Sequence, residues 1–223
     1  MLGLLVLAAM LTGGYLFVFA PVPRGRSPLE IALFVASRSG AAMVLLTPLI
    51  VMAPPLPPTF FPYIVGKAVY SRTLIEVVFG LWLVLSLRYP QYRMPKSWLL
   101  PVFGAYVVVV LLASLFGVSP QRSLWSTYER MQGFIDLAHW FAFVIVVASV
   151  FRSWLDWRAL LNFNLGVSAV IGLLGIAQHQ DIQVLSFLSQ GARVDITLGN
   201  PTYVGSYMLV NTFIAMGFLV HSI

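Results

Sequence analysis

The sequence predicts an all-α fold, a polytopic bundle of transmembrane helices with about seven spans in this chain. Of the 223 residues, 60% are hydrophobic and only 9% are charged, whereas a soluble domain carries roughly 25% charged residues. The mean hydropathy is +0.91, and several apolar stretches approach or exceed the roughly 20 residues that a helix needs to cross a bilayer. The chain has too few polar side chains to cover a globule in water, so we expect it to lie in a lipid bilayer.

Seven apolar segments are long enough to be spans, and short connections rich in turn residues separate them. The first segment also fits a cleavable signal peptide, but it lacks a basic amino-terminal region and a small-x-small cleavage site, which favours a retained helix. Tryptophans near the segment ends fit the aromatic belt of a membrane protein. The expected spans are residues 2–20, 35–53, 69–87, 98–116, 133–150, 160–177 and 203–220.

The second span is expected to end at the proline-rich segment 54–58, because proline cannot continue a helix. Arg38 lies near the start of this span, where its long side chain can reach the lipid head groups. Residues 29–34 are expected either to lie in the membrane interface before the span or to extend it as a longer, tilted helix.

Lysine and arginine are unevenly distributed over alternate connections. One set holds eight of the 13 basic residues and the other holds five, and the positive-inside rule places the larger set on the cytoplasmic side. The connections 54–68, 117–132 and 178–202 are then external. The five external basic residues exceed what the topology needs, which indicates either scatter with local salt bridges or an anion-binding site. They are Lys67, Arg72, Arg122, Arg130 and Arg193, and the cytoplasmic set is Arg24, Arg26, Arg38, Arg88, Arg93, Lys96, Arg152 and Arg158.

The external segment 121–133 is polar and aromatic. Arg122 and Arg130 are eight residues apart and would share one face if the segment were helical, and an arginine fork can bind phosphate at two points. Trp125 and Tyr128 could provide a stacking surface for a sugar. The alternative is interfacial anchoring with a surface pair between Glu129 and Arg130.

A second external segment, residues 193–207, leads into the last span. Asn200 is expected to cap free amide groups there, with Pro201 at the first helical position. The amino terminus of a helix adds positive potential beside Arg193. This arrangement favours binding of an anionic group at the bilayer surface.

Ionisable residues also occur inside the predicted spans. Arg72 and Glu76 are four residues apart and can pair along one helix face. Asp136 and His139 are three apart and could form a hydrogen-bonded couple. Ionisable residues in a span suggest a functional site, although a structural ion pair or a satisfied core couple explains both pairs as well. His179, at the outer end of the sixth span, is a candidate base or an ordinary interfacial histidine.

Several classes of chemistry find no support in the sequence. The chain has no cysteine, which excludes disulfides, thiolate metal sites and a cysteine nucleophile. It has no metal-ligand spacing, Walker loop, dinucleotide fingerprint or serine-elbow motif, so we expect no metal and no cofactor. A basic stripe with interleaved aromatic residues is also missing, so nucleic acid is not an expected partner. Gly172 and Gly175, together with Ser168, are expected to allow close helix packing.

Four segments together resemble the O-antigen ligase family, within the wider O-antigen ligase and polymerase superfamily. They occur in order, in connections on one predicted side of the membrane. The resemblance covers residues 47–223, whereas residues 1–46, with the first helix, a basic loop and the start of the second span, match nothing in it. The segments are Phe61-Pro62-Tyr63-Ile64-Val65-Gly66-Lys67, Ser119-Pro120-Gln121-Arg122-Ser123-Leu124-Trp125-Ser126, Glu129-Arg130-Met131-Gln132-Gly133 and Leu198-Gly199-Asn200-Pro201-Thr202-Tyr203.

The resemblance implies a multi-pass glycosyltransferase of the bacterial inner (cytoplasmic) membrane with its site on the outer, periplasmic face. Such an enzyme transfers a glycan from a polyprenyl-diphosphate carrier to an acceptor in cell-envelope polysaccharide or glycoprotein assembly, without a metal or a nucleotide sugar. The family's catalytic histidine and second arginine are expected beyond Ile223, so no catalytic residue is assigned in this amino-terminal part. The diphosphate-binding candidates are Arg193, Arg130, Arg122 and Lys67, with Asn200, Trp125, Tyr128 and Glu129 as supporting residues.

Two other functions fit the same sequence. A transporter or flippase for an anionic or lipid-linked solute would use the same arginines, and inverted repeats would favour it. A non-catalytic membrane scaffold would need none of the missing catalytic region.

Overall fold

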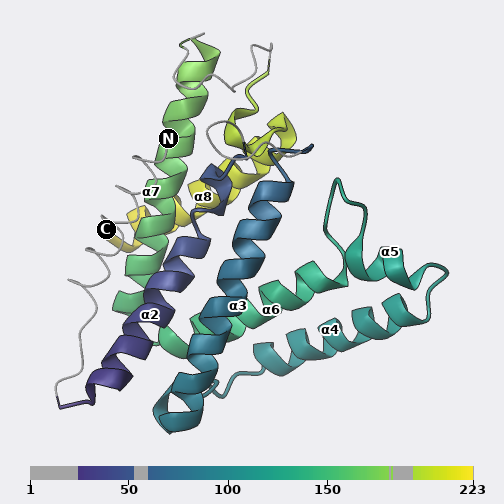
Figure 1. Ribbon diagram of the computed structural model, residues 1–223. Helices are drawn as coiled ribbons and strands as arrows, with labels where there is room; N and C mark the ends of the chain where they lie inside the picture. The colour runs from purple at the N-terminus through teal and green to yellow at the C-terminus, as the bar shows by residue number, and fades with distance from the viewer. Residues whose placement is uncertain (1–24, 53–59, 181, 183–192, 223) are drawn as a thin grey trace. The chain divides into compact units, whose positions relative to one another are not determined.

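The computed structural model describes residues 25–52, 60–180, 182 and 193–222, and in these ranges the regular secondary structure is entirely helical (Figure 1). The predicted all-α fold is therefore confirmed. The α-helices of the described residues are α2 (Pro28–Val44), α3 (Val65–Arg88), α4 (Leu99–Leu115), α5 (Pro120–Trp125), α6 (Phe134–Val150), α7 (Trp154–His179) and α8 (Pro201–Ser222). Short 3₁₀ turns form η1 (Thr47–Leu49), η2 (Pro90–Tyr92) and η3 (Ile196–Leu198).

Three helices of the described chain, α3, α7 and α8, are long and apolar enough to cross a membrane, and α4 and α6 are shorter apolar helices. The chain is therefore a membrane protein by the length and composition of its helices. These five helices correspond to the third to seventh expected spans. The sixth is longer than expected, because α7 already begins at Trp154. The first expected span, residues 2–20, lies outside the described residues.

The expected bounds of the second span were wrong. Instead of residues 35–53, the helix is α2, Pro28–Val44, and residues 29–34 form its first turns. The backbone amide of Glu30 donates to the Ser27 hydroxyl at 3.2 Å, so Ser27 caps the helix and Pro28 follows it. Pro48 lies in η1 and cannot donate a helical hydrogen bond, which explains why the helix does not continue toward residue 53.

Arg38 was expected at the lipid head groups, but it is buried in the middle of α2. Its side chain is 4% exposed, and its guanidinium pairs with Asp156 at 2.6 Å. The guanidinium also lies over the rings of Phe34 and Phe151, 5.2 and 4.8 Å from their centroids. Because α2 begins at Pro28, Arg38 is the eleventh residue of the helix and not one near its start.

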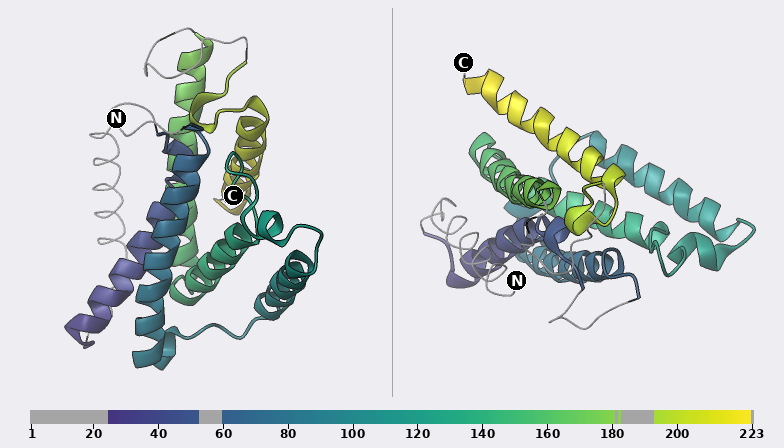
Figure 2. Two further views of the ribbon diagram at one scale, coloured as in Figure 1. Left: turned by 45° about the vertical axis from the view of Figure 1, so that its right-hand side comes forward. Right: turned by 90° about the horizontal axis from the view of Figure 1, so that it is seen from above.

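The chain divides into two compact units. The first unit comprises the described residues 25–44 and 68–159, and the second comprises the described residues from 45 to 67 and from 160 onward. In the first unit α6 packs against α2, α4 and α5, and α4 lies beside α6 (Figure 2). The second unit has a buried core of Leu46, Val167, Ile171 and Ile196.

Connections that the basic-residue count assigns to the cytoplasm lie together in the first unit. Glu30, at the start of α2, accepts hydrogen bonds from Gln91 at 2.9 Å and from Tyr92 at 3.1 Å. The guanidinium of Arg152 donates to the carbonyl oxygen of Arg93. The start of α2 and the connections after α3 and α6 therefore share one end of the unit. Which side of the membrane this end faces remains a prediction.

Reporter fusions will check that prediction. We expect fusions after Gln91 and Ser153 to give cytoplasmic signals, and a fusion after Gln121 to give an external signal, because the larger set of basic residues retains its connections in the cytoplasm. Fusions after Gln91 and Gln121 that report the same side would contradict the topology, since α4 separates the two positions.

Candidate functional site

The turn before α8 is held by local hydrogen bonds. The carbonyl oxygen of Asp195 accepts from the backbone amides of Leu198 and Gly199 at 3.1 and 3.0 Å. The side-chain oxygen of Asn200 accepts from the amide of Thr202 at 2.8 Å, and Pro201 is the first residue of α8. The predicted cap by Asn200 and the predicted place of Pro201 are both confirmed.

Gly199 is required in this turn for two reasons. Its φ is +69°, in the left-handed region that favours glycine. A Cβ atom at this position would also lie 2.7 Å from Cβ of Tyr63. Burial raises the pKa of the Tyr63 hydroxyl, and the negative charge of Asp195 raises that pKa further. Tyr63 is therefore a neutral group that packs against the turn.

Lys67 connects three segments of the second unit. Its ammonium group donates to the carbonyl oxygens of Ile50 at 2.7 Å, of Tyr63 at 3.0 Å and of Thr197. An ammonium has three donors, so all of them are used within the protein. In this conformation no hydrogen bond of Lys67 remains for a diphosphate.

Gln178 is a residue of this region that the sequence analysis missed. It is buried at the end of α7, where its Nε2 donates to Oδ1 of Asp195 at 2.7 Å and its Oε1 accepts from the amide of Ile196 at 2.9 Å. One side chain thereby satisfies a donor and an acceptor of the turn. The sequence signal that could have identified it is a glutamine at the end of an apolar helix, because such a side chain needs polar partners when it is buried.

Arg193 is exposed and directly precedes the held segment. The next residue, Val194, packs against the buried core of the second unit. Packing and hydrogen bonds therefore position the backbone on the carboxyl side of Arg193. The Arg193 side chain itself is exposed and accessible to a ligand.

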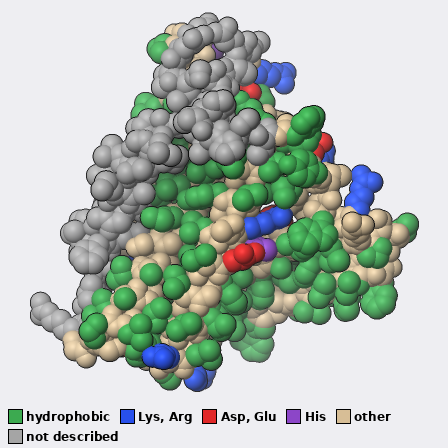
Figure 3. Space-filling view, in the orientation of Figure 1, with side chains coloured by type: hydrophobic (Ala, Val, Ile, Leu, Met, Phe, Trp, Pro, Cys, Tyr) green, Lys and Arg blue, Asp and Glu red, His purple; other side chains and the backbone are tan. Residues whose placement is uncertain are grey.

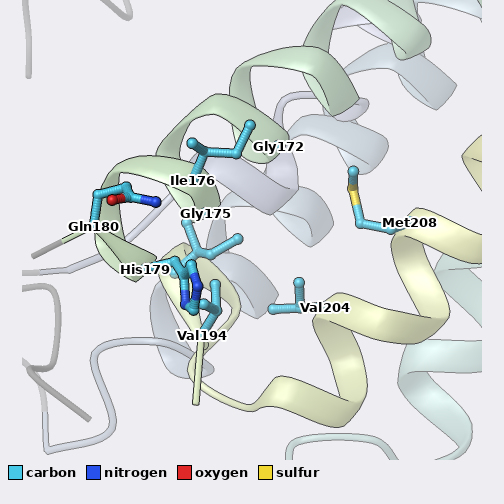
Figure 4. A pocket seen from close by; sticks show the side chains of 9 residues that line it. Gly172, Gly175, Ile176, His179, Gln180, Val194, Val204 and Met208 are labelled. Carbon is cyan, nitrogen blue, oxygen red and sulfur yellow. The ribbon is translucent and has the colours of Figure 1, made fainter. Parts of the chain in front are cut away.

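A pocket of about 450 Å³ adjoins the turn, between α7 and α8 (Figure 4). Gly172 and Gly175 allow the close packing expected of them: a Cβ would lie 3.3 Å from Cε of Met208 at the first and 3.0 Å from Cδ1 of Ile196 at the second. The lining is largely apolar, with His179 and Gln180 as its polar side chains. It comprises Gly172, Gly175, Ile176, His179, Gln180, Val194, Ile196, Val204 and Met208.

The external segment of the first unit is not one continuous helix. The helix α5 ends at Trp125, and Ser126 and Met131 have φ values of +66° and +51°. The expected common helical face of Arg122 and Arg130 is therefore wrong, because the turns between them break the helical repeat. Both arginines are exposed, as are the other candidates of this segment, Trp125, Tyr128 and Glu129.

The segment nevertheless has a defined fold. A Cβ at Gly133 would lie 2.2 Å from the carbonyl oxygen of Leu124, so only glycine permits the backbone to pass here, where α5 packs against the start of α6. The segments 119–126 and 129–133 therefore meet in the first unit. In the second unit, the close approach of Gly199 to Tyr63 likewise brings the segments 61–67 and 198–203 together.

The predicted ionisable pairs within helices were wrong in their partners. Arg72 of α3 pairs with Asp136 of α6 at 3.1 Å, rather than with Glu76. Glu76 pairs with His139 of α6 at 2.9 Å. Arg72 and Glu76 bind residues of α6 and not each other, because the side chains of α3 and α6 meet between the two helices. Figure 3 shows acidic, histidine and basic side chains side by side near the centre of a face that is otherwise largely hydrophobic.

The candidate residues therefore fall into two groups. Lys67, Arg193 and Asn200 belong to the second unit, and Arg122, Trp125, Tyr128, Glu129 and Arg130 belong to the first. That Arg130 and Arg193 approach each other stays a prediction, because they belong to different units. Within the described residues, no group of three or more histidine or acidic side chains could hold a metal ion.

Comparison with known proteins leaves the family resemblance untested. The chain matches no family model, no curated protein and no solved structure.

Proposed function

We propose that the chain belongs to an integral membrane glycosyltransferase that transfers a glycan from a polyprenyl-diphosphate carrier to an acceptor hydroxyl, with its site on the outer face of the bacterial cytoplasmic membrane. The observation that carries the proposal is the exposed Arg193 on a held turn at the amino terminus of α8, a helix of membrane-spanning length. The resemblance of the four segments supports the same conclusion.

The surroundings of Arg193 suit a diphosphate. A guanidinium remains charged at any physiological pH and can bind two phosphate oxygens at once. The amino terminus of α8 adds positive potential on the same turn. Because Gln178, Lys67 and Tyr63 already hold the turn, little backbone entropy is lost when a ligand binds.

The apolar pocket beside the turn suits a ligand that also carries a lipid. Diphosphate is a good leaving group, so transfer of a glycan mainly requires cations that stabilise the departing charge and a base that takes the proton of the acceptor hydroxyl. The second unit contributes one such cation, Arg193.

A binding experiment tests the proposal. We expect the purified protein in lipid nanodiscs to bind polyprenyl diphosphate more tightly than the polyprenyl monophosphate or the free polyprenol, and Arg193→Ala to weaken diphosphate binding by about tenfold or more, the value of one charged hydrogen-bonded contact. Arg158→Ala is the matched control, since Arg158 is exposed but lies in the predicted cytoplasmic set. Equal affinity for the three lipids would reject the proposed function.

A further inference from the structure

One end of the first unit carries a cluster of exposed basic side chains. Hydrogen bonds hold this end together, because Gln91, after α3, donates to Glu30 at the start of α2, and Arg152, after α6, donates to the carbonyl oxygen of Arg93. All the basic residues of the cluster belong to the first unit. We call them the basic surface, and they are Arg88, Arg93, Lys96, Arg152 and Arg158.

The two acidic side chains of this end are paired with other basic residues. Glu30 has a side chain that is 7% exposed, and it pairs with Arg26 at 2.7 Å. Asp156 has a side chain that is 12% exposed, and it pairs with Arg38 at 2.6 Å. Both carboxylates are therefore enclosed and neutralised by residues that are not members of the basic surface.

The elements that form the basic surface contain no other acidic residue near it. The connection 89–98 has none, and on α3 the acidic residue closest in sequence to Arg88 is Glu76, about 18 Å away along the helix axis. Within the described residues, no member of the basic surface forms an ion pair. On the face drawn in Figure 3, basic side chains lie without acidic neighbours where α3 ends in Figure 1. The positive charge of the basic surface is therefore not balanced by these elements.

Exposed tryptophans place the basic surface at the level of the lipid head groups. Trp98 is 88% exposed and follows Lys96 by two residues. Trp154 is also exposed and lies four residues before Arg158 on α7, so the two side chains share one face of the helix. Tryptophan is enriched at the membrane–water interface, and long basic side chains extend to the same depth. The phosphate groups of phospholipids are therefore within reach of this surface.

Orientation in the membrane does not by itself explain the lack of acidic neighbours. The positive-inside rule counts lysine and arginine, and aspartate and glutamate contribute little to it. A surface that served orientation alone could therefore carry acidic residues among its basic ones. An anionic membrane surface, in contrast, attracts the net positive charge beside it, and acidic neighbours would cancel that charge. The separation of basic from acidic side chains at this end therefore favours contact with an anionic lipid.

We propose that the basic surface binds the phosphate groups of anionic phospholipids in the leaflet that this end of the first unit faces. The guanidinium of an arginine can bind two phosphate oxygens at once, and the ammonium of Lys96 adds a further positive charge. Trp98 and Trp154 contact the same lipids below their head groups. Such binding requires neither glycan transfer nor a particular orientation of the chain in the membrane.

Native mass spectrometry of the purified chain tests this binding. The protein in nonionic detergent is equilibrated with equal amounts of phosphatidylglycerol and phosphatidylcholine, and the lipids that it retains are counted. The wild type should retain phosphatidylglycerol in preference to phosphatidylcholine by about tenfold or more. A triple variant with Arg93→Gln, Lys96→Gln and Arg158→Gln should lose most of this preference. Its fold should be kept, because the three side chains are exposed.

A double variant with Arg93→Lys and Arg158→Lys is the matched control, because it keeps the charge and should keep the preference. A triple variant with the wild-type preference would overturn the inference. Equal retention of the two lipids by the wild type would do the same and leave these residues a role in orientation alone. If the triple variant does not accumulate, the wild type decides at raised ionic strength. Its preference should then fall, because salt screens exposed charges, and an unchanged preference is contrary to the proposal.

Discussion

Replacing Arg193 by alanine should reduce glycan transfer by about 100-fold or more, the effect of removing one contact that stabilises charge in a transition state. The amount of protein in the membrane should stay nearly unchanged. Arg193 is exposed, so its truncation removes little packing, and surface substitutions of this kind alter stability only slightly. The measurement is the rate of transfer from a lipid-linked glycan to its acceptor, normalised to the protein present.

Two further variants make this prediction specific. Arg193→Lys should recover only part of the rate, because an ammonium cannot reproduce the two-point contact of a guanidinium with phosphate. Arg158→Ala, at an exposed arginine of the other predicted side, should transfer at the wild-type rate. Full activity of Arg193→Ala would refute its role in the site, and loss of the variant protein from the membrane would make Arg193 structural.

Lys67→Met should destabilise the protein by about 3 kcal/mol or more, because it removes three hydrogen bonds from a charged donor and leaves carbonyl oxygens without that partner. The loss should appear as a lower midpoint of thermal unfolding in detergent. The affinity for polyprenyl diphosphate should fall as well, because the carbonyl of Thr197 in the turn before α8 is one of the three acceptors. Lys67→Arg should recover only part of the stability, since a planar guanidinium does not fit three carbonyls arranged around an ammonium.

Lys96→Met provides the control for this change, as Lys96 is an exposed lysine in the connection after α3, and its midpoint should match that of the wild type. The comparison also separates two roles of Lys67. If the residue were only a diphosphate ligand, the Lys67→Met protein would lose affinity for the carrier while its thermal midpoint stayed the same, contrary to our expectation.

The helices were largely predictable because the length of an apolar run is a property of the sequence. The expected span 98–116 differs by one residue at each end from α4 (Leu99–Leu115), and the expected span 133–150 differs by one residue at its start from α6 (Phe134–Val150). The prediction of the second span was wrong because it followed hydropathy, and apolar residues continue past Val44. Two local signals mark the true ends of this helix: Ser27, which caps its start, and Pro48, which lies after its end.

In the candidate site, too, local interactions could be predicted from the sequence and interactions between distant residues could not. The cap of α8 by Asn200 was predictable, because the capping side chain and the amide that it binds are two residues apart. The two ionisable pairs were predicted within their helices, whereas the structure joins α3 to α6 through Arg72 with Asp136 and Glu76 with His139. Sequence spacing reports which partners are within reach along one helix, but it contains no information on which neighbouring helix is nearer.

The sequence by itself determined that this is an all-helical membrane protein, gave the approximate positions of α3, α4, α6, α7 and α8, and placed Arg122, Arg130 and Arg193 in polar connections. Only the tertiary structure decided the partners of three polar groups in the helices: Arg38 with Asp156, Lys67 with three carbonyl oxygens, and His139 with Glu76. The physical reason is that a charge or donor in an apolar environment is costly without a partner, and the partner is set by helix packing between residues far apart in the chain.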